Sequence, residues 1–429
     1  MSGSDIGRVV EAVWRMESAR IVGALTRMLR DVGIAEELAQ DAMLQALESW
    51  PAGGVPDRPG AWLMQVAKHR ALDHLRHASM RAGKEGELSW EMDEQLREGQ
   101  RQPDELAELA QMAGTGIDDD VLRLIFVSCH PVLSGEARAA LTLKLIGGLS
   151  TAEIARAFLV PDATVAQRIV RAKRTLAEAK VPFEVPRGEE RRPRLASVLQ
   201  VIYLIYNEGY SASAGADWLR PGLCREALRL GRVLAELAPE EGEVHGLVAL
   251  MEIQSSRERA RTGPNGEPVL LLDQDRSRWD RLLIGRGLAA LARAGRLGSL
   301  GPYGLQAAIA ACHARALRAD ATDWAGIAAL YDALAALLPS PIVELNRAVA
   351  LGMAYGPAEG LALADQLLDE PRLANYHLLP SVRGDLLAKL GRHAEARTEF
   401  ERAAGLTQNE RERSLLLARA RDEKVRIGE

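Results

Sequence analysis

The sequence predicts an all-α protein built from a helical bundle, a helix-turn-helix domain and a C-terminal region of helical repeats. Three observations lead to this expectation. Aromatic residues are sparse, with 7 Trp, 7 Tyr and 4 Phe in 429 residues. Runs of Val or Ile bounded by turn signals, which would indicate strands, are nearly absent. Apolar residues instead recur every three or four positions over long segments, as amphipathic helices require.

Length and composition limit the class of protein. A chain of 429 residues is long enough for about two to four domains. Hydrophobic residues make up 47% and charged residues 26%, values typical of folded soluble proteins. We expect no membrane segment and no secretion signal, and therefore a cytoplasmic location. Cys129, Cys224 and Cys312 lie far apart without metal-ligand spacing, which argues against zinc and disulfides and suits a reducing compartment.

Charge is distributed unevenly along the chain, whose net charge is -5. Residues 85–120 hold twelve acidic residues against Arg97 and Arg101, a local net charge of -10. Residues 62–84 and 164–180, on either side, are each strongly basic. We therefore predict an acidic linker over 84–125 between two folded, basic pieces. A short basic stretch with prolines at 185–194 marks a further boundary.

Residues 149–178 give the sharpest functional signal, a helix-turn-helix pattern. Ser150 and Glu153 have capping-box spacing at the start of one helix. After a turn at 159–162, Asp162 or Thr164 is expected to cap a second helix, whose apolar stripe is Val165, Ile169, Ala172 and Leu176. Polar side chains would face outward and read or contact DNA: Thr164, Gln167, Arg168, Arg171, Lys173 and Arg174. The alternative is an ordinary solvated basic helix.

Residues 61–77 predict a second helix with a candidate role in DNA binding. Leu63, Ala67, Ala71 and Leu75 would form its buried stripe, opposite Trp62, Gln65, His69 and Arg76. An exposed Trp beside cations can stack on an unpaired base. Equally, Trp62 could fill a gap in the core. The preceding segment 51–60, rich in Pro and Gly and containing Arg58, is expected to be a binding loop.

The second half of the chain, 195–429, predicts paired helices of a degenerate tetratricopeptide-like repeat. Apolar stripes alternate with Pro or Gly breaks. Gly352 and Gly391 hold similar places in the last two predicted helix pairs, but they are 39 residues apart, so the repeat is irregular. Such a region could fold back on the first half or receive a partner peptide on a concave face.

Three clusters hold residue types found in catalytic sites, and a structural role is favoured for each. Asp273, Asp275 and Asp280 alternate with three arginines and are expected to form salt bridges between helices. Cys129 and His130 are adjacent, so their side chains diverge on a helix. Residues 206–210 predict a helix end with Gly209 at the C′ position. Nucleotide-binding, hydrolase and metalloprotease motifs are absent. We expect a protein that is not an enzyme and needs no cofactor or metal.

Together and in this order, these features resemble bacterial RNA polymerase sigma factors of the extracytoplasmic-function type. The resemblance implies a region 2 over 1–83, a linker over 84–125 and a region 4 helix-turn-helix over 126–184. It implies that region 4 reads the -35 promoter element and that Arg58, Trp62, Gln65, His69 and Arg76 capture the -10 strand. It also implies that one helix of this chain binds the clamp helices of the polymerase core through Glu37, Gln40, Asp41, Leu44 and Leu47.

The resemblance extends to the subgroup that carries a tetratricopeptide-like C-terminal extension, here 195–429. Its supporting strings include YLIYNEGYSAS, LLLDQDRSRWDR and SPIVELNRAVA. It implies that no dedicated anti-sigma partner exists and that activity depends on the extension, to which a regulatory protein or peptide could bind. Two other functions stay open: a polymerase-independent helix-turn-helix regulator with a helical sensor domain, and a protein-interaction scaffold.

Overall fold

The computed structural model describes residues 3–81, 114–158, 160–211, 219–264 and 266–427. Most of the predicted acidic linker falls outside these ranges. The chain forms two compact units that meet in sequence between Val201 and Ile202. All named elements of the described residues are helices, and one isolated β-bridge joins Thr262 to Pro268, which confirms the predicted all-α class.

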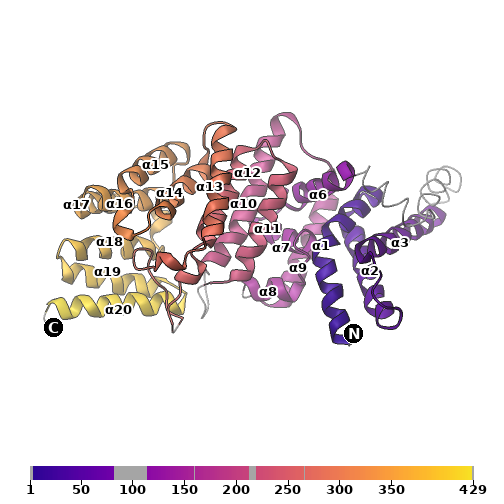
Figure 1. The fold of residues 1–429 in the computed structure, drawn as a ribbon, viewed down its shortest axis with the longest axis horizontal. Coiled ribbons are helices and arrows are strands. Elements are labelled where there is room, and N and C mark those ends of the chain that lie inside the picture. Colours follow the sequence, from indigo (N-terminus) through magenta and orange to yellow (C-terminus); the bar gives the residue numbers. More distant parts are fainter. Residues whose placement is uncertain (1–2, 82–113, 159, 212–218, 265, 428–429) are drawn as a thin grey trace. The chain divides into compact units, whose positions relative to one another are not determined.

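Seven α-helices lie entirely within the described residues of the first unit (Figure 1, indigo to magenta). They are α1 (Gly3–Leu29), α2 (Val32–Gly53), α3 (Pro59–Arg81), α6 (Gly114–Ser128), α7 (Gly135–Leu145), α8 (Thr151–Phe158) and α9 (Asp162–Glu178). Helices α1, α2 and α3 pack on one another around Ile21, Leu25 and Leu63, which are fully buried. Asp31 starts α2 by accepting a hydrogen bond from the amide of Ile34 at 3.0 Å.

Helix α6 begins inside the segment assigned to the linker and packs on α1. A Cβ added to Gly23 of α1 would lie 3.1 Å from the carbonyl oxygen of Asp120, so the two backbones approach closely. The Asp120 side chain is buried and pairs with Arg123 at 2.7 Å and with Arg27 of α1 at 3.3 Å. The last acidic residues of the segment therefore belong to a packed helix.

Helix α10 (Arg191–Tyr210) crosses the boundary between the units. In its first half, Arg194 donates to the carbonyl of Phe126 at 2.9 Å and Ser197 donates to the carbonyl of Cys129 at 2.6 Å. Residues 195–201, which the sequence assigned to the C-terminal region, thus pack with the first unit. The remainder of α10 belongs to the second unit.

The second unit is a succession of helices in which each packs on the next (Figure 1, from red-brown to yellow). After α10 they are α11 (Pro221–Leu237), α12 (Gly242–Ser255), α13 (Arg281–Arg296), α14 (Pro302–Arg315), α15 (Trp324–Leu337), α16 (Pro341–Tyr355), α17 (Pro357–Asp365), α18 (Leu378–Lys389), α19 (His393–Leu406) and α20 (Glu410–Ile427). Short 3-10 turns link some of them: η2 (Glu258–Ala260), η3 (Arg276–Arg278), η4 (Ala319–Ala321) and η5 (Pro371–Leu373). This order of helices agrees with a helical-repeat region.

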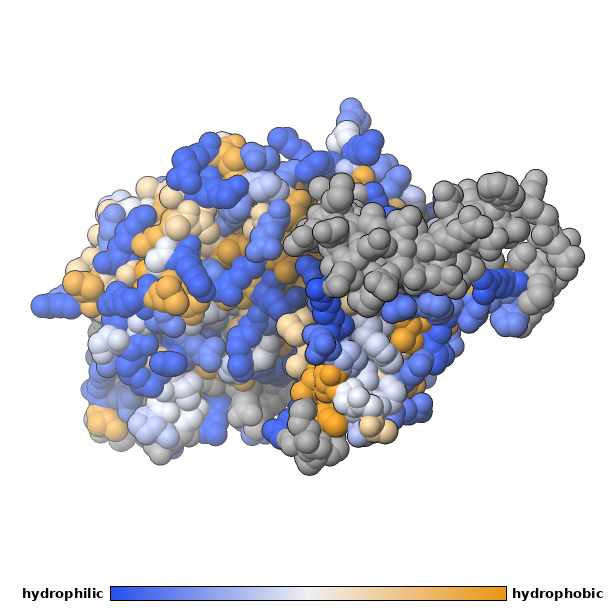
Figure 2. Space-filling view, turned by 45° about the vertical axis from the view of Figure 1, so that its right-hand side comes forward, coloured by the Kyte–Doolittle hydropathy of each residue, from blue (hydrophilic) through white to orange (hydrophobic). Residues whose placement is uncertain are grey.

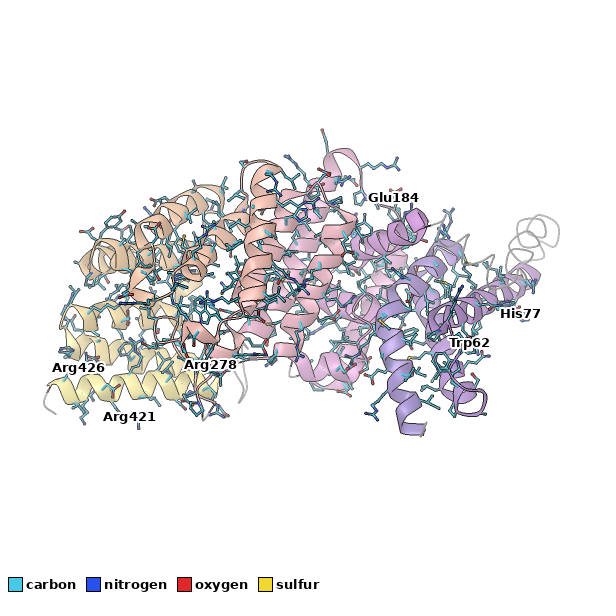
Figure 3. All side chains as sticks on the ribbon, viewed as in Figure 1. Trp62, His77, Glu184, Arg278, Arg421 and Arg426 are labelled. Carbon is cyan, nitrogen blue, oxygen red and sulfur yellow. The ribbon has the colours of Figure 1, made fainter. Side chains whose placement is uncertain are left out.

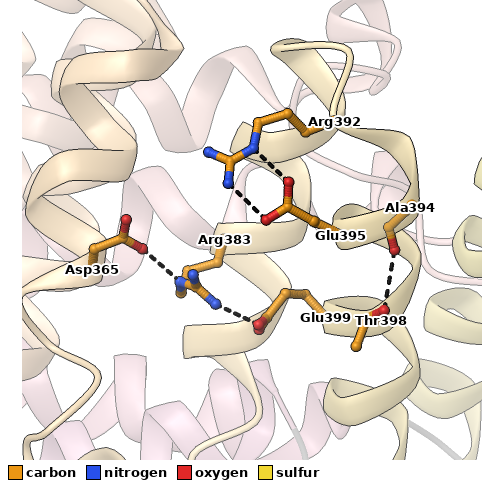
Figure 4. A network of polar contacts seen from close by, with 7 residues as sticks. All are labelled: Asp365, Arg383, Arg392, Ala394, Glu395, Thr398 and Glu399. Carbon is orange, nitrogen blue, oxygen red and sulfur yellow. Dashed lines mark hydrogen bonds and ion pairs between the residues drawn. The ribbon is translucent and has the colours of Figure 1, made fainter.

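Polar contacts also tie neighbouring helices of the second unit together. Arg383 of α18 donates to Asp365 of α17 at 2.9 Å and pairs with Glu399 of α19, so one guanidinium bridges three helices (Figure 4). The predicted correspondence of Gly352 with Gly391 is wrong. Gly352 lies within α16 against Leu386, whereas Gly391 takes a positive φ of 75° in the turn after α18.

Hydrophilic side chains cover most of the face seen in Figure 2, with hydrophobic ones in small groups between them. No helix in the described part of the chain is long and apolar enough to cross a membrane.

Candidate nucleic-acid interface

The helix-turn-helix begins with the predicted capping box. The amide of Ser150 donates to the Glu153 carboxylate at 2.8 Å, and the amide of Glu153 donates to the Ser150 hydroxyl at 3.2 Å. The predicted cap of the second helix is wrong. Pro161 occupies the N-cap position of α9 without any side-chain cap bond, and the amide of Thr164 bonds to the Pro161 carbonyl at 2.9 Å. The fixed φ of proline starts this helix in place of a polar side chain.

Helix α9 buries the predicted apolar stripe. Val165, Ile169, Ala172 and Leu176 are each at most 5% exposed. On the opposite side Thr164, Gln167, Arg171 and Arg174 are exposed. Arg174 makes only a loose pair along the helix, with Glu178 at 3.3 Å, and 74% of its side chain stays accessible. The exposed face therefore presents hydrogen-bonding groups of the kinds that pair with base edges and phosphates in a major groove.

Two of the six predicted DNA-contacting residues lie at the sides of this face and are engaged within the protein. Arg168 is half-buried and pairs with Glu136 at the start of α7, at 2.5 Å. Lys173 is also half-buried, and its ammonium group pairs with Glu36 of α2. The structure thus separates the six into four that are exposed and two that are half-buried and paired with acidic residues of other helices.

The helix predicted over 61–77 is part of α3. Leu63, Ala67 and Ala71 are buried as expected, but Leu72 completes the stripe and Leu75 is only half-buried. Gln65 and His69 are exposed. Arg76 is half-buried and pairs with Asp73 at 3.4 Å.

The side chain of Trp62 (Figure 3) is neither fully exposed, as base stacking would favour, nor fully buried in the core. The side chain is half-buried, and its ring meets Trp50 edge to face, with ring centroids 5.5 Å apart. Trp50 is fully buried, so it fills the core while Trp62 keeps part of its surface accessible. The predicted loop at 51–60 is shorter than expected, because α2 continues through Pro51 to Gly53 and α3 begins at Pro59. Arg58 is exposed in the remaining connection.

Helix α2 carries the five residues assigned to the polymerase core. Glu37 is exposed, and Leu44 and Leu47 are 56% and 37% exposed, although both are large and apolar. Gln40 and Asp41 are half-buried: Gln40 donates to Glu36, and Asp41 accepts from Arg70 of α3 at 3.2 Å. The two accessible leucines are one turn apart and form a small apolar surface on α2.

The predicted salt-bridge network at 273–281 is wrong. Asp275 and Asp280 instead cap η3 and α13, with Asp280 accepting from the amides of Leu282 and Leu283. Arg276 is buried and donates to the carbonyls of His313 and Ala316, both at 2.8 Å, and to Thr322. These carboxylates are occupied by backbone amides, and the arginine fastens a loop of the second unit.

The other two candidate clusters are also structural. Burial raises the pKa of Cys129 to about 11, against hydrogen bonds from Thr142 and Ser128 that lower it, so the thiol stays protonated and unreactive. The helix end predicted at 206–210 is confirmed, because α10 ends at Tyr210, but Gly209 does not occupy the C′ position. It lies within α10, where an added Cβ would come 2.6 Å from the backbone nitrogen of Cys224, so glycine allows α10 and α11 to approach closely.

Val170 and Glu36 belong to the interface but were not predicted from the sequence. Val170 is 65% exposed on α9, between the rows of Gln167 and Arg174. Its position outside the apolar stripe could have been read from the helical periodicity. Glu36 is 6% exposed and pairs with Lys144 of α7 at 3.6 Å as well as with Lys173. No local pattern signals these pairs, because their partners are more than a hundred residues away.

Comparisons with known proteins match the same parts of the chain. Residues 13–81 match the sigma-70 region 2 family and residues 123–176 match the sigma-70 region 4 family. Residues 194–295 match a family of unknown function, DUF6596.

Similar proteins cover either most of this chain or less than half of it. An uncharacterized protein of Rhizobium meliloti, R00370, is 45% identical over 388 residues, covering 90% of this chain and 89% of the relative. The probable ECF RNA polymerase sigma factor SigI of Mycobacterium tuberculosis is 28% identical over 182 residues, 42% of this chain and 59% of SigI. The ECF sigma factor SigC of the same species is 28% identical over 179 residues, 42% of this chain and 87% of SigC. The chain belongs to the extracytoplasmic-function type of sigma-70 factors, the non-catalytic subunits for promoter-specific transcription initiation, and it carries a C-terminal DUF6596 extension.

Proposed function

We propose that the chain brings core RNA polymerase to its promoters through three surfaces of the first unit. Region 2 (1–83) binds the clamp helices of the core with the exposed face of α2 and holds the opened -10 strand with α3 and the connection before it. Region 4 (126–184) reads the -35 duplex with α9. The work is done in the cytoplasm, where the polymerase transcribes.

The observation that carries the proposal is the division of α9 into two faces. The side chains of one face are at most 5% exposed, and the other face presents Gln167, Arg171 and Arg174 to solvent. Arginine pairs bidentately with guanine and glutamine with adenine, each worth about 1–3 kcal/mol of discrimination. Leu44 and Leu47 on α2 support the polymerase contact, which a polymerase-independent regulator would not need.

Run-off transcription with purified core polymerase and the upstream region of the chain's own gene tests the proposal. We expect a discrete transcript that requires the protein. Leu44→Arg should abolish both that transcript and co-elution with core polymerase, because a charge would be placed in an apolar contact. Met16→Arg is the matched control, since Met16 is 67% exposed on α1, outside the proposed surfaces. Promoter binding without any polymerase contact would favour the independent regulator, and failure to bind DNA would favour the scaffold.

We also propose that the C-terminal region (195–429) regulates this activity, either directly or through a bound partner protein. Truncation is the direct test, and α10 sets where the cut belongs. A cut at 195 would remove Ser197, which bonds to Cys129 in the first unit. A chain ending after Tyr210 keeps all of α10. Unchanged transcription by that chain would refute a regulatory role.

A further inference from the structure

Val170 is the largest aliphatic side chain on the exposed face of α9, where the smaller Ala163 and Ala166 are also exposed among polar residues. It is 65% exposed, three residues after Gln167 and four before Arg174, so the three lie on one side of α9. Single exposed aliphatic residues are common on protein surfaces and need no explanation by themselves. The position of this one is informative, because its immediate neighbours on the face are the candidate base-reading residues.

The chemistry of the major groove identifies what such a residue can contact. The only apolar group on a base edge there is the C5-methyl of thymine. Valine is short and has a stiff χ1, so its two methyl groups stay close to the helix axis and cannot reach aside to the phosphates. Longer neighbours such as Arg171 and Arg174 can extend past it to adjacent bases or phosphates.

We propose that Val170 is a specificity-determining residue that contacts a thymine methyl in the -35 duplex, next to the bases read by Gln167 and Arg171. The inference rests on the proposed function of α9. It predicts that the recognised duplex holds a thymine at one fixed position. Removal of that methyl alone should then weaken binding.

Deoxyuridine provides the test, since it lacks only the C5-methyl of thymine. The full-length protein with core polymerase first selects duplexes from a pool with a randomised -35 segment. Each thymine of the selected duplex is then replaced in turn by deoxyuridine. One replacement should weaken wild-type binding about fourfold, the effect of one buried methyl group. Val170→Ala should weaken binding of the thymine duplex by a similar factor and lose the preference for thymine over uracil.

Controls separate this inference from the proposed function. Val132→Ala changes an exposed valine outside α9, 44% accessible, and should keep the thymine preference. If Val170→Ala keeps the full preference, or weakens all duplexes equally, Val170 does not read thymine. If the wild type selects sequences without any thymine preference, this inference fails while the proposed function stands. If it selects no sequence at all, both fail.

A second, independent observation concerns Glu36. This buried carboxylate of α2 faces the ammonium groups of Lys144 and Lys173. Buried carboxylates need such partners, because desolvation of an unpaired charge is costly. Lys173 is a cation of α9 that we assign to DNA contact, and in this structure its ammonium group pairs with an acidic residue of α2.

Other contacts bring the same parts of the first unit together. Arg15 of α1 pairs with Glu153 at the start of α8. A Cβ added to Gly148, whose φ is 66°, would lie 2.9 Å from the Ser18 hydroxyl, so the turn before α8 rests on α1. The Glu36–Lys173 pair is therefore part of a contact surface between α1–α2 and α7–α9.

We infer that Glu36 competes with a DNA phosphate for Lys173, and that this competition lowers the affinity of the protein for the -35 duplex. This inference also rests on the proposed function. The selected duplex described above is the probe. Glu36→Gln keeps an acceptor for Gln40 and removes the charge. It should tighten duplex binding about fivefold, because the ion pair with Glu36 no longer has to break before Lys173 contacts a phosphate.

A double-mutant cycle decides whether Lys173 mediates this effect. In a Lys173→Gln background, Glu36→Gln should change duplex affinity little. An equal gain in both backgrounds would mean that Glu36 acts only as a nearby negative charge, and no gain would mean that no competition exists. Either result overturns the inference, while wild-type binding still reports on the proposed function.

Two control variants change charged residues on the helix of Glu36 or in contact with Glu36. Glu48→Gln removes an exposed charge from α2 and should leave affinity unchanged. Lys144→Met removes the other partner of Glu36 but leaves the pair with Lys173, so it should give no gain. If Glu36→Gln does not fold, the cycle is repeated with Glu36→Asp, whose shorter side chain withdraws the carboxylate from Lys173.

Discussion

The exposed arginines of α9 in the first unit and two buried arginines of the second unit serve opposite purposes. On α9 of the first unit, Arg171 and Arg174 are exposed and their guanidinium groups are available to a ligand. In the second unit, Arg276 is 4% exposed and donates to two backbone carbonyls and a hydroxyl, and Arg261 is 7% exposed with its guanidinium 3.5 Å from the centre of the Tyr210 ring. A buried cation with good acceptors holds segments of one unit together, whereas an exposed cation contributes little to stability. Mutations should therefore separate binding from folding.

The largest effect is expected for Arg276→Met. The variant keeps most of the side-chain volume but leaves the carbonyls of His313 and Ala316 without their donor. Loss of three charge-assisted hydrogen bonds should lower the free energy of unfolding by about 4 kcal/mol. Urea unfolding of the full chain measures this loss. Duplex binding by the remaining folded protein should be unchanged, and a stability loss below about 1 kcal/mol would contradict the anchoring role of Arg276.

A pH effect of slightly smaller size follows from His313. Burial, together with Arg257 and Arg276, lowers its pKa to about 4. The unfolded chain takes up this proton near pH 6.5 and the folded chain only near pH 4, so stability falls as pH drops through this window. Acidification from pH 7 to below 4 should cost about 3 kcal/mol from this group. His313→Gln should lose correspondingly less stability over the same range, measured by urea unfolding at each pH; parallel curves would show that His313 does not contribute.

Arg171→Ala tests whether an exposed arginine of α9 contributes to DNA binding and not to stability. It should weaken binding to the selected -35 duplex by about 2 kcal/mol and relax the preference at one base pair, because a bidentate contact is lost. Its free energy of unfolding should change by less than about 0.5 kcal/mol. Electrophoretic mobility shifts with single-base variants of the duplex measure the first effect. A uniform loss over all sequences would reassign Arg171 to the phosphate backbone.

The same comparison explains which features were predictable from the sequence. The capping box at Ser150 and the stripe from Val165 to Leu176 depend on residues three to eleven positions apart, and both were found as predicted. Gly209 and Arg276 were misread because their roles depend on Cys224 and on residues 313–322, which local patterns do not bring together. Arg168 and Lys173 were correctly placed outside the stripe, yet their acidic partners Glu136 and Glu36 come from other helices.

The smallest effect is expected at the helix caps. The cap predicted at Ser150 is present in the structure, whereas the one predicted at Asp162 or Thr164 is not. Ser150→Ala removes the hydroxyl that accepts from the amide of Glu153 and should destabilise α8 by about 1 kcal/mol. Thr164→Ala should change the stability of α9 by less than about 0.5 kcal/mol, because Pro161 starts that helix without a side-chain cap. Hydrogen exchange of the α8 and α9 amides measures both effects locally. Equal losses in the two variants would mean that Thr164 caps α9 in solution, and the difference between the two helix starts would then disappear.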